Sequence, residues 1–164
     1  METLEAIAAR CSTRSYKPDA VPKATLEKIV DAGRLAASAR NEQPWDFIAV
    51  TDAGTRKAIA ELTDYGKFIA DVPVCICVLC KTTKYYLEDG SAAAQNMLVA
   101  AAALGVQSCW VAGDKKEYAP KVVELLGATA EHKLVALLAM GYASGPVPRR
   151  SKRTLSQVLH WEKF

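Results

Sequence analysis

The sequence predicts an α/β or α+β protein in which helices cover a buried sheet. Three observations lead to this class. Helical and strand-like segments alternate along the 164 residues, no internal repeat is visible, and the composition is that of an ordinary globular protein, with 51% hydrophobic and 24% charged residues. The composition excludes a disordered chain, a collagen-like repeat and a disulfide miniprotein. We expect a single domain over residues 1–164, because this length suits one hydrophobic core.

Periodicity defines the elements of the first third of the chain. Apolar residues at helical spacing predict a short helix that ends near Arg10 and, after an extended connector with two prolines, a second helix over 25–37. Residues 46–51 predict a strand, and Asp52 is placed to cap a third helix over 55–62.

A buried strand and a long helix are predicted next. Residues 72–79 form a continuous apolar run with β-branched side chains, which is typical of a strand buried on both faces. An Ala-rich helix over 91–104 follows, with Gly105 as its stop. The polar groups of Gln95 and Asn96 inside this helix need partners, either across a helix interface or on a ligand.

The last predicted elements are a short strand at 109–111, a helix over 118–126, and a run over 133–142 that favours a buried strand with a helix as the competing interpretation. From residue 145 the chain is rich in proline and arginine and forms a C-terminal arm, residues 145–164. The most apolar stretch, 92–103, is well short of the ~20 residues of a membrane-spanning helix. We therefore expect a buried core helix there and no membrane partner.

Cysteine usage indicates a reducing compartment. The chain has five cysteines, an odd number, and it begins with acidic residues instead of a basic secretory leader. We therefore expect free thiols and a cytoplasmic location. Cys75, Cys77 and Cys80 have the spacing of a partial metal site, but no fourth ligand is visible, so buried unreactive thiols are the favoured interpretation.

Several catalytic motifs are absent from the sequence. It contains no Gly-x-Gly of a dinucleotide-binding turn, no phosphate-binding loop and no nucleophile elbow. His132 and His160 have no partner at metal-ligand spacing. An enzyme built on this chain would therefore leave its chemistry to an organic cofactor.

Two basic clusters are candidates for binding an anion. Arg10, Ser12 and Arg14 alternate just past the first predicted helix, so in an extended segment they share one face and can bind phosphate oxygens. A second cluster, near the C-terminus, includes Arg150 and Lys152. The alternatives are a solvated helix end for the first cluster and a solvated tail or weak nucleic-acid patch for the second. A net charge of +3 is too small to predict a nucleic-acid partner by itself.

A polar loop is predicted between the second helix and the first strand. Ser38, Asn41 and Gln43 both donate and accept hydrogen bonds, which suits the edge of a polar heterocycle. Pro44 and Trp45 beside them are stiff and apolar. The alternative interpretation is an ordinary helix end followed by a packed loop.

Four segments, in this order, resemble motifs of the FMN-dependent nitroreductase family. They are residues 10–16 (RCSTRSY), similar to Arg-Arg-Ser-x-Arg-x-Phe; residues 37–45 (ASARNEQPW), similar to Pro-Ser-x-x-Asn-x-Gln-Pro-Trp; residues 89–113, similar to the central helix and its Gly-x-x-Cys-Trp strand; and the ending RTL…HWE from residue 153. Together they cover essentially the whole chain. Cys11, Ala37 and Thr154 depart from the family pattern, and the chain has little room for an inserted lid.

The resemblance implies an α+β fold with a mixed sheet covered by helices on both faces. It also implies a homodimer with FMN held at the subunit interface, where the small residues of the Ala-rich helix allow close packing. The FMN phosphate would be bound by a basic set of residues: Arg10, Ser12, Arg14, Arg150 and Lys152.

The same resemblance assigns residues to the isoalloxazine ring. Ser38, Asn41 and Gln43 would reach the ring, in this family often from the partner subunit. Ala112 and Gly113 would let the backbone approach the ring, because neither side chain blocks it.

The implied activity is that of an NAD(P)H-dependent flavin oxidoreductase. Hydride would pass from NADH or NADPH to flavin N5 and then to a small-molecule oxidant such as a nitroaromatic or a quinone, both substrates using the same ring face in turn. No side-chain nucleophile or metal is required. The alternatives are a family member that reduces an enone or a halogenated compound, a non-catalytic flavin- or nucleotide-binding protein, and a small nucleic-acid-binding module.

Overall fold

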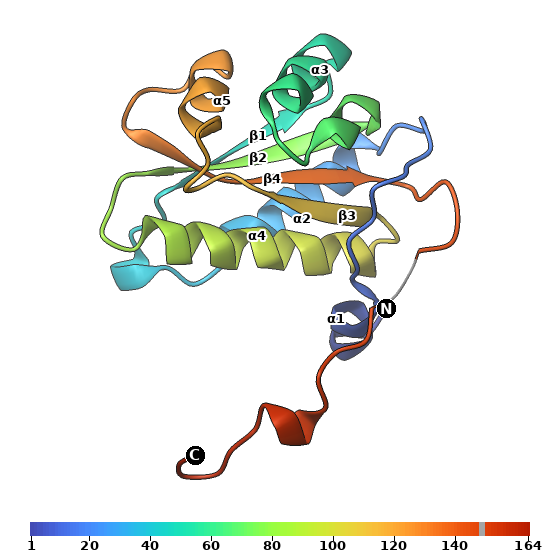
Figure 1. The fold of residues 1–164 in the computed structure, drawn as a ribbon, viewed down its shortest axis with the longest axis vertical. Coiled ribbons are helices and arrows are strands. Elements are labelled where there is room, and N and C mark those ends of the chain that lie inside the picture. Colours follow the sequence, from blue (N-terminus) through green and yellow to red (C-terminus); the bar gives the residue numbers. More distant parts are fainter. Residues whose placement is uncertain (148–149) are drawn as a thin grey trace.

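The fold consists of a four-stranded sheet between two layers of helices (Figure 1). The computed structural model describes residues 1–147 and 150–164. Its elements are α1 (Thr3–Ala9), α2 (Lys23–Arg34), β1 (Trp45–Val50), α3 (Ala53–Leu62), β2 (Val74–Lys81), α4 (Tyr86–Ala103), β3 (Gln107–Ala112), α5 (Ala119–Leu125) and β4 (His132–Gly141), with short 3-10 turns η1 (Ala39–Asn41), η2 (Lys67–Asp71) and η3 (Leu155–Gln157).

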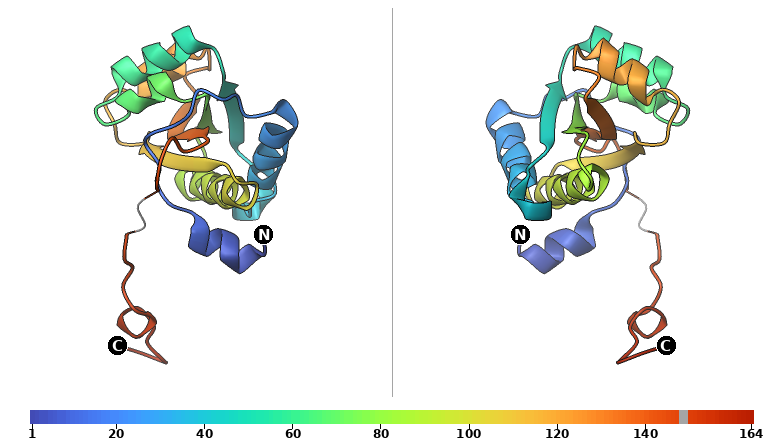
Figure 2. Two further views of the ribbon diagram at one scale, coloured as in Figure 1. Left: turned by 90° about the vertical axis from the view of Figure 1, so that its right-hand side faces the viewer. Right: turned by 90° about the vertical axis from the view of Figure 1, so that its left-hand side faces the viewer.

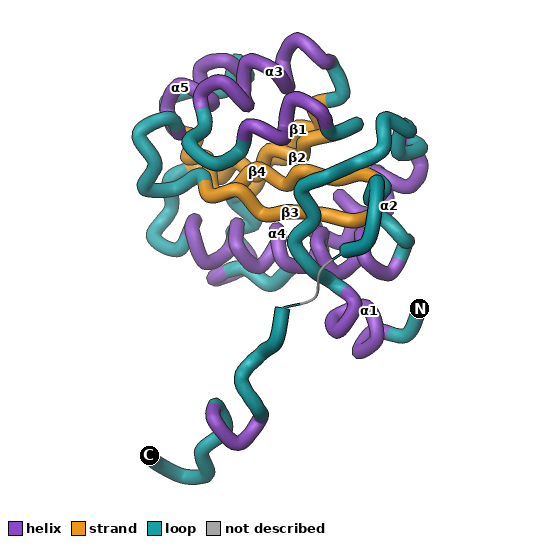
Figure 3. Tube along the Cα trace, turned by 45° about the vertical axis from the view of Figure 1, so that its right-hand side comes forward, coloured by secondary structure: helices purple, strands orange, loops and turns teal. Residues whose placement is uncertain are grey.

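The strand order in the sheet is β1-β2-β4-β3, and each neighbouring pair of these strands is antiparallel. A parallel contact comes from outside them, where Ser12 forms an isolated bridge with Ser108 of β3. β1 and β3 are therefore the two edges, and the N-terminal segment passes the start of β3, where this bridge forms (Figure 3). The α+β class predicted from the sequence is confirmed.

Helices cover both faces of the sheet, as predicted (Figure 2). α2 and α4 pack on one face, and α3 and α5 on the other. The side chains of β2 alternate between the two layers: Ile76 and Val78 contact the α2 and α4 side, whereas Cys75 and Cys77 contact the α3 and α5 side. This alternation explains why β2 has no polar face in the sequence.

The structure resolves the ambiguous run 133–142 as a strand. β4 pairs with β2 on one side and with β3 on the other, so its backbone groups are satisfied by two ladders. Most of its side chains are fully buried between the two helical layers. The helix alternative is therefore wrong, and the continuous apolar run reflects a central strand.

Two predicted helix boundaries are wrong. α2 ends at Arg34 instead of residue 37, because Leu35 is largely exposed and the Ala36 N–H already closes a tighter bond to the Gly33 carbonyl oxygen. α4 begins at Tyr86 instead of residue 91. Its first turn carries no Ala-rich signal, but Gly90 lets this turn approach the sheet closely.

Two polar predictions are confirmed by hydrogen bonds. Asp52 caps α3, accepting from the Thr55 backbone N–H at 2.7 Å, and this bond lowers the pKa of the Asp52 carboxyl. Asn96 of α4 donates to the Ala32 carbonyl oxygen of α2 at 3.1 Å. Asn96 thus finds its partner across a helix interface, whereas Gln95 is exposed to solvent and needs none within the protein.

The C-terminal segment leaves the body of the molecule (Figure 1). All residues from 150 to 164 are exposed, including five large apolar side chains: Leu155, Val158, Leu159, Trp161 and Phe164. Over the two described ranges, no helix has the length and apolar character needed to span a membrane.

Candidate functional site

The segment after α1 is held along the edge of the sheet. Ser12 bridges Ser108 of β3, and the Thr13 backbone N–H donates to the Ser108 carbonyl oxygen at 3.0 Å. An extended backbone points successive side chains to opposite sides. Thr13 is buried, whereas Ser12 and Arg14 on either side of it are exposed. The structure thus places Ser12 and Arg14 on the open side of the segment.

Five residues from the two ends of the chain line one cavity of about 610 Å³. Arg10, Ser12 and Arg14 come from the segment after α1, and Arg150 and Lys152 come from the C-terminal arm. We call these five residues the anion cradle. The described lining residues include four cations and no acid, so the cavity suits an anion with several oxygens, such as a phosphate.

Two titratable groups next to the cradle, the Cys109 thiol and the Tyr16 hydroxyl, add no negative charge to it. Burial raises the pKa of the Cys109 thiol. Three weaker effects lower it: the charge of Arg14, a hydrogen bond with Ser12, and the charge of Arg10. Burial also raises the pKa of Tyr16, whose hydroxyl donates to the Thr13 carbonyl oxygen. Both groups are therefore neutral at pH 7, and the guanidinium groups keep their full effect on an incoming anion.

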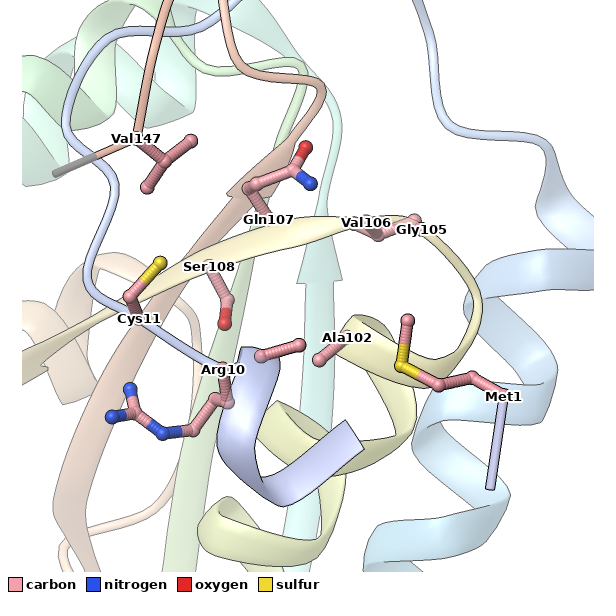
Figure 4. Close-up of a pocket in the computed structure, with 10 residues that line it drawn as sticks. Met1, Arg10, Cys11, Ala102, Gly105, Val106, Gln107, Ser108 and Val147 are labelled. Carbon is pink, nitrogen blue, oxygen red and sulfur yellow. The ribbon is translucent and has the colours of Figure 1, made fainter. Parts of the chain in front are cut away.

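A smaller hollow of about 310 Å³ lies beside the cradle (Figure 4). It lies between the C-terminal end of α4 and the start of β3, and Arg10 and Cys11 line both this hollow and the cavity of the cradle. In Figure 4 the Arg10 guanidinium group points away from Ala102 and Gly105. The charge of Arg10 is thus directed away from this hollow.

The end of β3 continues the site along the same edge. Arg14 also lines a second cavity of about 120 Å³, together with Trp110 and Ala112 of β3. Ala112 is exposed, so its small side chain leaves the edge of the strand open. Tyr65, Phe68 and Tyr118 add aromatic rings to this cavity, and Lys116 adds a second cation beside Arg14.

The structure explains the glycine at position 113 by packing against β4, whereas the family resemblance explained it by access to the flavin ring. Gly113 is buried, and a Cβ at this position would lie 2.6 Å from the carbonyl oxygen of Leu134 and 2.9 Å from the carbonyl carbon of Val135. Both are backbone atoms of β4, which cannot move aside easily. Close packing of the chain after β3 against β4 therefore requires glycine here, whatever the site binds.

The polar loop of residues 38–43 is closed by its own hydrogen bonds. The Gln43 backbone N–H donates to Ser38 Oγ at 3.0 Å, and Gln43 Nε2 donates to the Asn41 carbonyl oxygen at 3.3 Å. Arg40, Asn41 and Gln43 all have left-handed backbone angles, with φ of 53°, 57° and 47°. Such angles are costly for residues other than glycine, and they occur often at functional sites.

Asp89 holds this loop, and sequence reasoning missed it. Its Oδ1 accepts a hydrogen bond from the Ala39 backbone N–H at 2.9 Å, and the residue is only 5% exposed. The signal in the sequence was an acidic residue beside Gly90 just before the Ala-rich stretch. That signal reveals a carboxylate near a helix start, but not which segment it contacts.

The two predicted halves of the site lie at opposite ends of α4 (Figure 1). The loop is tied to Asp89 in the first turn, whereas α1 and Arg10 lie near Ala102 in the last turn. At 1.5 Å per helical residue these two points are about 20 Å apart. Gln43 lines a separate cavity, of about 890 Å³, between α2 and β1. Within one chain, the structure does not bring Ser38, Asn41 and Gln43 together with the anion cradle.

The cysteines are placed as the sequence predicted. Cys75 and Cys77 are buried on one face of β2 and Cys80 on the other, and all five cysteines are free. A hydrogen bond with Cys77, followed by burial, raises the pKa of Cys75. Among residues 1–147 and 150–164, no three potential metal ligands gather at one point. Cys75, Cys77 and Cys80 are thus packed in the core.

The fold and the site together define a class: a small α+β protein with a cationic cradle at one edge of its sheet and an open, small-residue strand end beside it. The model of the Nitroreductase family matches residues 7–72 and 64–142 of this chain. The chain belongs to the Nitroreductase family.

Relatives and solved structures agree with this assignment. A protein of Methanothermobacter thermautotrophicus, named for NADH dehydrogenase and NAD(P)H nitroreductase activity, is 34% identical over 100% of this chain and 88% of its own length. A nitroreductase of Desulfovibrio desulfuricans, solved in complex with FMN, is 29% identical, with a TM-score of 0.88 over 100% of this chain and 98% of that chain. An FMN-dependent nitroreductase of Clostridium difficile gives a TM-score of 0.92 at 25% identity, over 98% and 99% of the two chains.

Proposed function

We propose that this protein is an NAD(P)H-dependent FMN oxidoreductase that works as a homodimer and reduces an electron-poor acceptor such as a nitroaromatic or a quinone. The anion cradle is the observation that carries the proposal, since two distant parts of the chain place four cations and a hydroxyl around one cavity. The names of the relatives support it: one similar structure contains FMN, and several relatives are named for NAD(P)H.

The described residues fit FMN. Its phosphate monoester is a dianion with three terminal oxygens. Arg10 and Arg14 can each donate two N–H hydrogen bonds to such oxygens, and the Ser12 hydroxyl can donate one more. The planar ring system would lie along the edge of β3, where the aromatic cavity at Trp110 and Ala112 shares Arg14 with the cradle. The cradle therefore provides affinity, and the strand end provides an open surface.

A second copy of the chain would complete the site. Asn41 and Gln43 lie about 20 Å along α4 from the cradle of their own chain. An antiparallel arrangement of two copies would bring the first turn of one α4 near the last turn of the other. The outer face of α4 suits this contact, because Ala92, Val99 and Ala103 are small and only half-buried.

The C-terminal arm, residues 145–164, supports the same arrangement. Its five large apolar side chains are exposed in the isolated chain and would be covered by a partner subunit. We also place the protein in the cytoplasm, in keeping with five free thiols.

Each group of residues has a separate task in the proposed reaction. FMN, when bound, would supply the redox chemistry, a relay of hydride between NAD(P)H and the acceptor. Arg10 and Arg14 neutralise the phosphate and anchor the cofactor. The amides of Asn41 and Gln43 donate to the polar edge of the ring system and stabilise negative charge there. Ala112 leaves one ring face free for nicotinamide and acceptor in turn.

The visible absorption spectrum of the purified protein tests this proposal. We expect flavin bands that disappear when NADH or NADPH is added without oxygen and that return when a quinone is added. Bands that persist would indicate a flavin-binding protein without this reductive activity. A colourless protein that also fails to bind added FMN would contradict the proposal.

A further inference from the structure

We propose that Asp89 is the positioning residue that makes the loop of residues 38–43 competent to bind the cofactor, through its hydrogen bond to the Ala39 backbone N–H. This inference rests on the proposed function and adds a residue to it. Asp89 acts through the loop, because it is buried and its Oδ1 accepts the hydrogen bond from the Ala39 N–H.

The position of Asp89 is fixed by the packing of α4 on the sheet. A Cβ at Gly90 would lie 2.7 Å from Val135 Cγ2 and 2.8 Å from Cys80 Sγ, so the glycine lets the first turn of α4 approach β2 and β4 closely. Asp89 immediately precedes Gly90 and lies in the first turn of α4, where the helix dipole favours a carboxylate. The carboxylate is thus held rigidly against the core, and the loop is attached to it through the Ala39 N–H.

The loop depends on an external anchor because its own backbone is strained. Arg40, Asn41 and Gln43 adopt left-handed angles, and a segment of this kind keeps its shape only when its surroundings determine it. The Gln43 N–H donates a hydrogen bond to Ser38 Oγ, which closes the loop on itself. The Ala39 N–H donates to Asp89 Oδ1, and this hydrogen bond ties the closed loop to α4.

Asp89 is a costly residue for stability alone. Its second carboxylate oxygen, Oδ2, is buried and has no hydrogen-bond partner among the described residues. The neighbouring Cys80 thiol cannot supply a positive charge to the carboxylate, and burial, followed by the charges of Asp89 and Asp46, raises its pKa to about 12, so it stays neutral. A buried carboxylate satisfied on one oxygen destabilises the fold, and an alanine in this turn would not. Placement of the loop explains why a carboxylate is there.

The first test compares three variants in two measurements. In the protein without cofactor, Asp89→Ala should increase hydrogen exchange of the Ala39 amide by on the order of tenfold or more, because the acceptor is lost. Affinity for FMN should fall by on the order of tenfold, while the midpoint of thermal unfolding stays equal or rises. Asp89→Asn keeps an oxygen acceptor and should remain within about threefold of the wild type in both measurements. Glu88→Ala removes an exposed acid from the same turn and is the matched control.

The second test removes the donor and leaves Asp89 in place. Ala39→Pro deletes the N–H at the first position of η1, where the extended Ser38 before it is compatible with proline. We expect this variant to weaken FMN binding, and the double variant with Asp89→Ala to be no weaker than the weaker single variant. This test also covers the case in which Asp89→Ala does not fold.

The outcomes separate the two proposals. If the wild type binds FMN and Asp89→Ala binds it equally well, the positioning role is wrong and the proposed function stands. If Asp89→Asn is as weak as Asp89→Ala, the charge matters and not the hydrogen bond, which also overturns the inference. If the wild type binds no FMN, the proposed function fails, and the positioning role fails with it, although the exchange of the Ala39 amide still reports whether the anchor exists.

Discussion

The anion cradle and the loop of residues 38–43 are both polar, but they are built in opposite ways. The cradle segment lies along β3 in an extended conformation, fixed by a backbone bridge from Ser12 to Ser108. The loop has three residues at left-handed angles and is held by a side chain of α4. The cradle segment is thus attached to the sheet by its backbone, and the loop is attached to α4 by the Asp89 side chain.

This contrast shows what each half can tolerate. The cradle segment of residues 10–14 stays in place when one side chain is removed, because its backbone pairing does not depend on that side chain. A strained loop depends on a few contacts, so it can shift when one of them is lost. We therefore expect substitutions in the cradle to change binding strength, and substitutions in the loop to change its geometry.

The largest expected effect lies where β3 meets β4. Gly113→Ala places a Cβ 2.6 Å from the carbonyl oxygen of Leu134, and this part of the sheet cannot yield without breaking backbone packing. We expect the free energy of unfolding to fall by about 2–4 kcal/mol in chemical denaturation.

Gly145→Ala is the matched control, because a Cβ there meets no atom within 4 Å. We expect it to change the free energy of unfolding by less than about 0.5 kcal/mol. Equal, small effects at both positions would mean that the rigid half of the site is less rigid than its packing indicates.

The next effect concerns binding in the cradle. Arg14→Ala removes an exposed guanidinium that lines both the cradle and the aromatic cavity. We expect FMN affinity to fall by roughly 10- to 100-fold, as for the loss of a charge-assisted hydrogen bond, with unfolding unchanged. Fluorescence quenching of FMN during titration measures this.

Lys17→Ala controls for net charge, because Lys17 is an exposed cation outside the cradle. It should bind FMN nearly as well as the wild type. An Arg14→Ala variant that is purified with a full complement of flavin would refute the assignment of the phosphate to this cavity.

The sequence was sufficient for the fold where patterns are local or continuous. β2 was recognisable as an apolar run and Asp52 as a helix cap, because each signal lies in the residues concerned, whereas the run of β4 favoured a strand but left a helix open. The start of α4 was missed for a physical reason. Its first turn is stabilised by packing of Gly90 against Cys80 and Val135, a tertiary contact that overrides the weak helix propensity of glycine.

The candidate site likewise contains residues with a local sequence signal and residues whose role depends on tertiary contacts. Arg10, Ser12 and Arg14 follow a two-residue period, and a period can be recognised in a sequence. Asp89 lies 50 residues from Ala39, and nothing local relates the two. Gly113 was noticed for its small size. The reason that glycine is required there is the backbone of β4 at Leu134, which lies 21 residues further along the chain.

The smallest expected effect tests strain in the loop. Arg40 has a φ of 53° and an exposed side chain without a recorded partner among the described residues, so glycine can adopt its backbone conformation more easily. We expect Arg40→Gly to raise the free energy of unfolding by about 0.5 kcal/mol, since the relief of strain slightly exceeds the added entropy of the unfolded chain. Ala39→Gly, one residue earlier and without a left-handed angle, should lower it by about 0.5–1 kcal/mol. Opposite signs at neighbouring positions would show that the loop holds its shape against a local cost. The same sign at both would mean that the loop is relaxed, and the contrast between the two halves of the site would then rest on Asp89 alone.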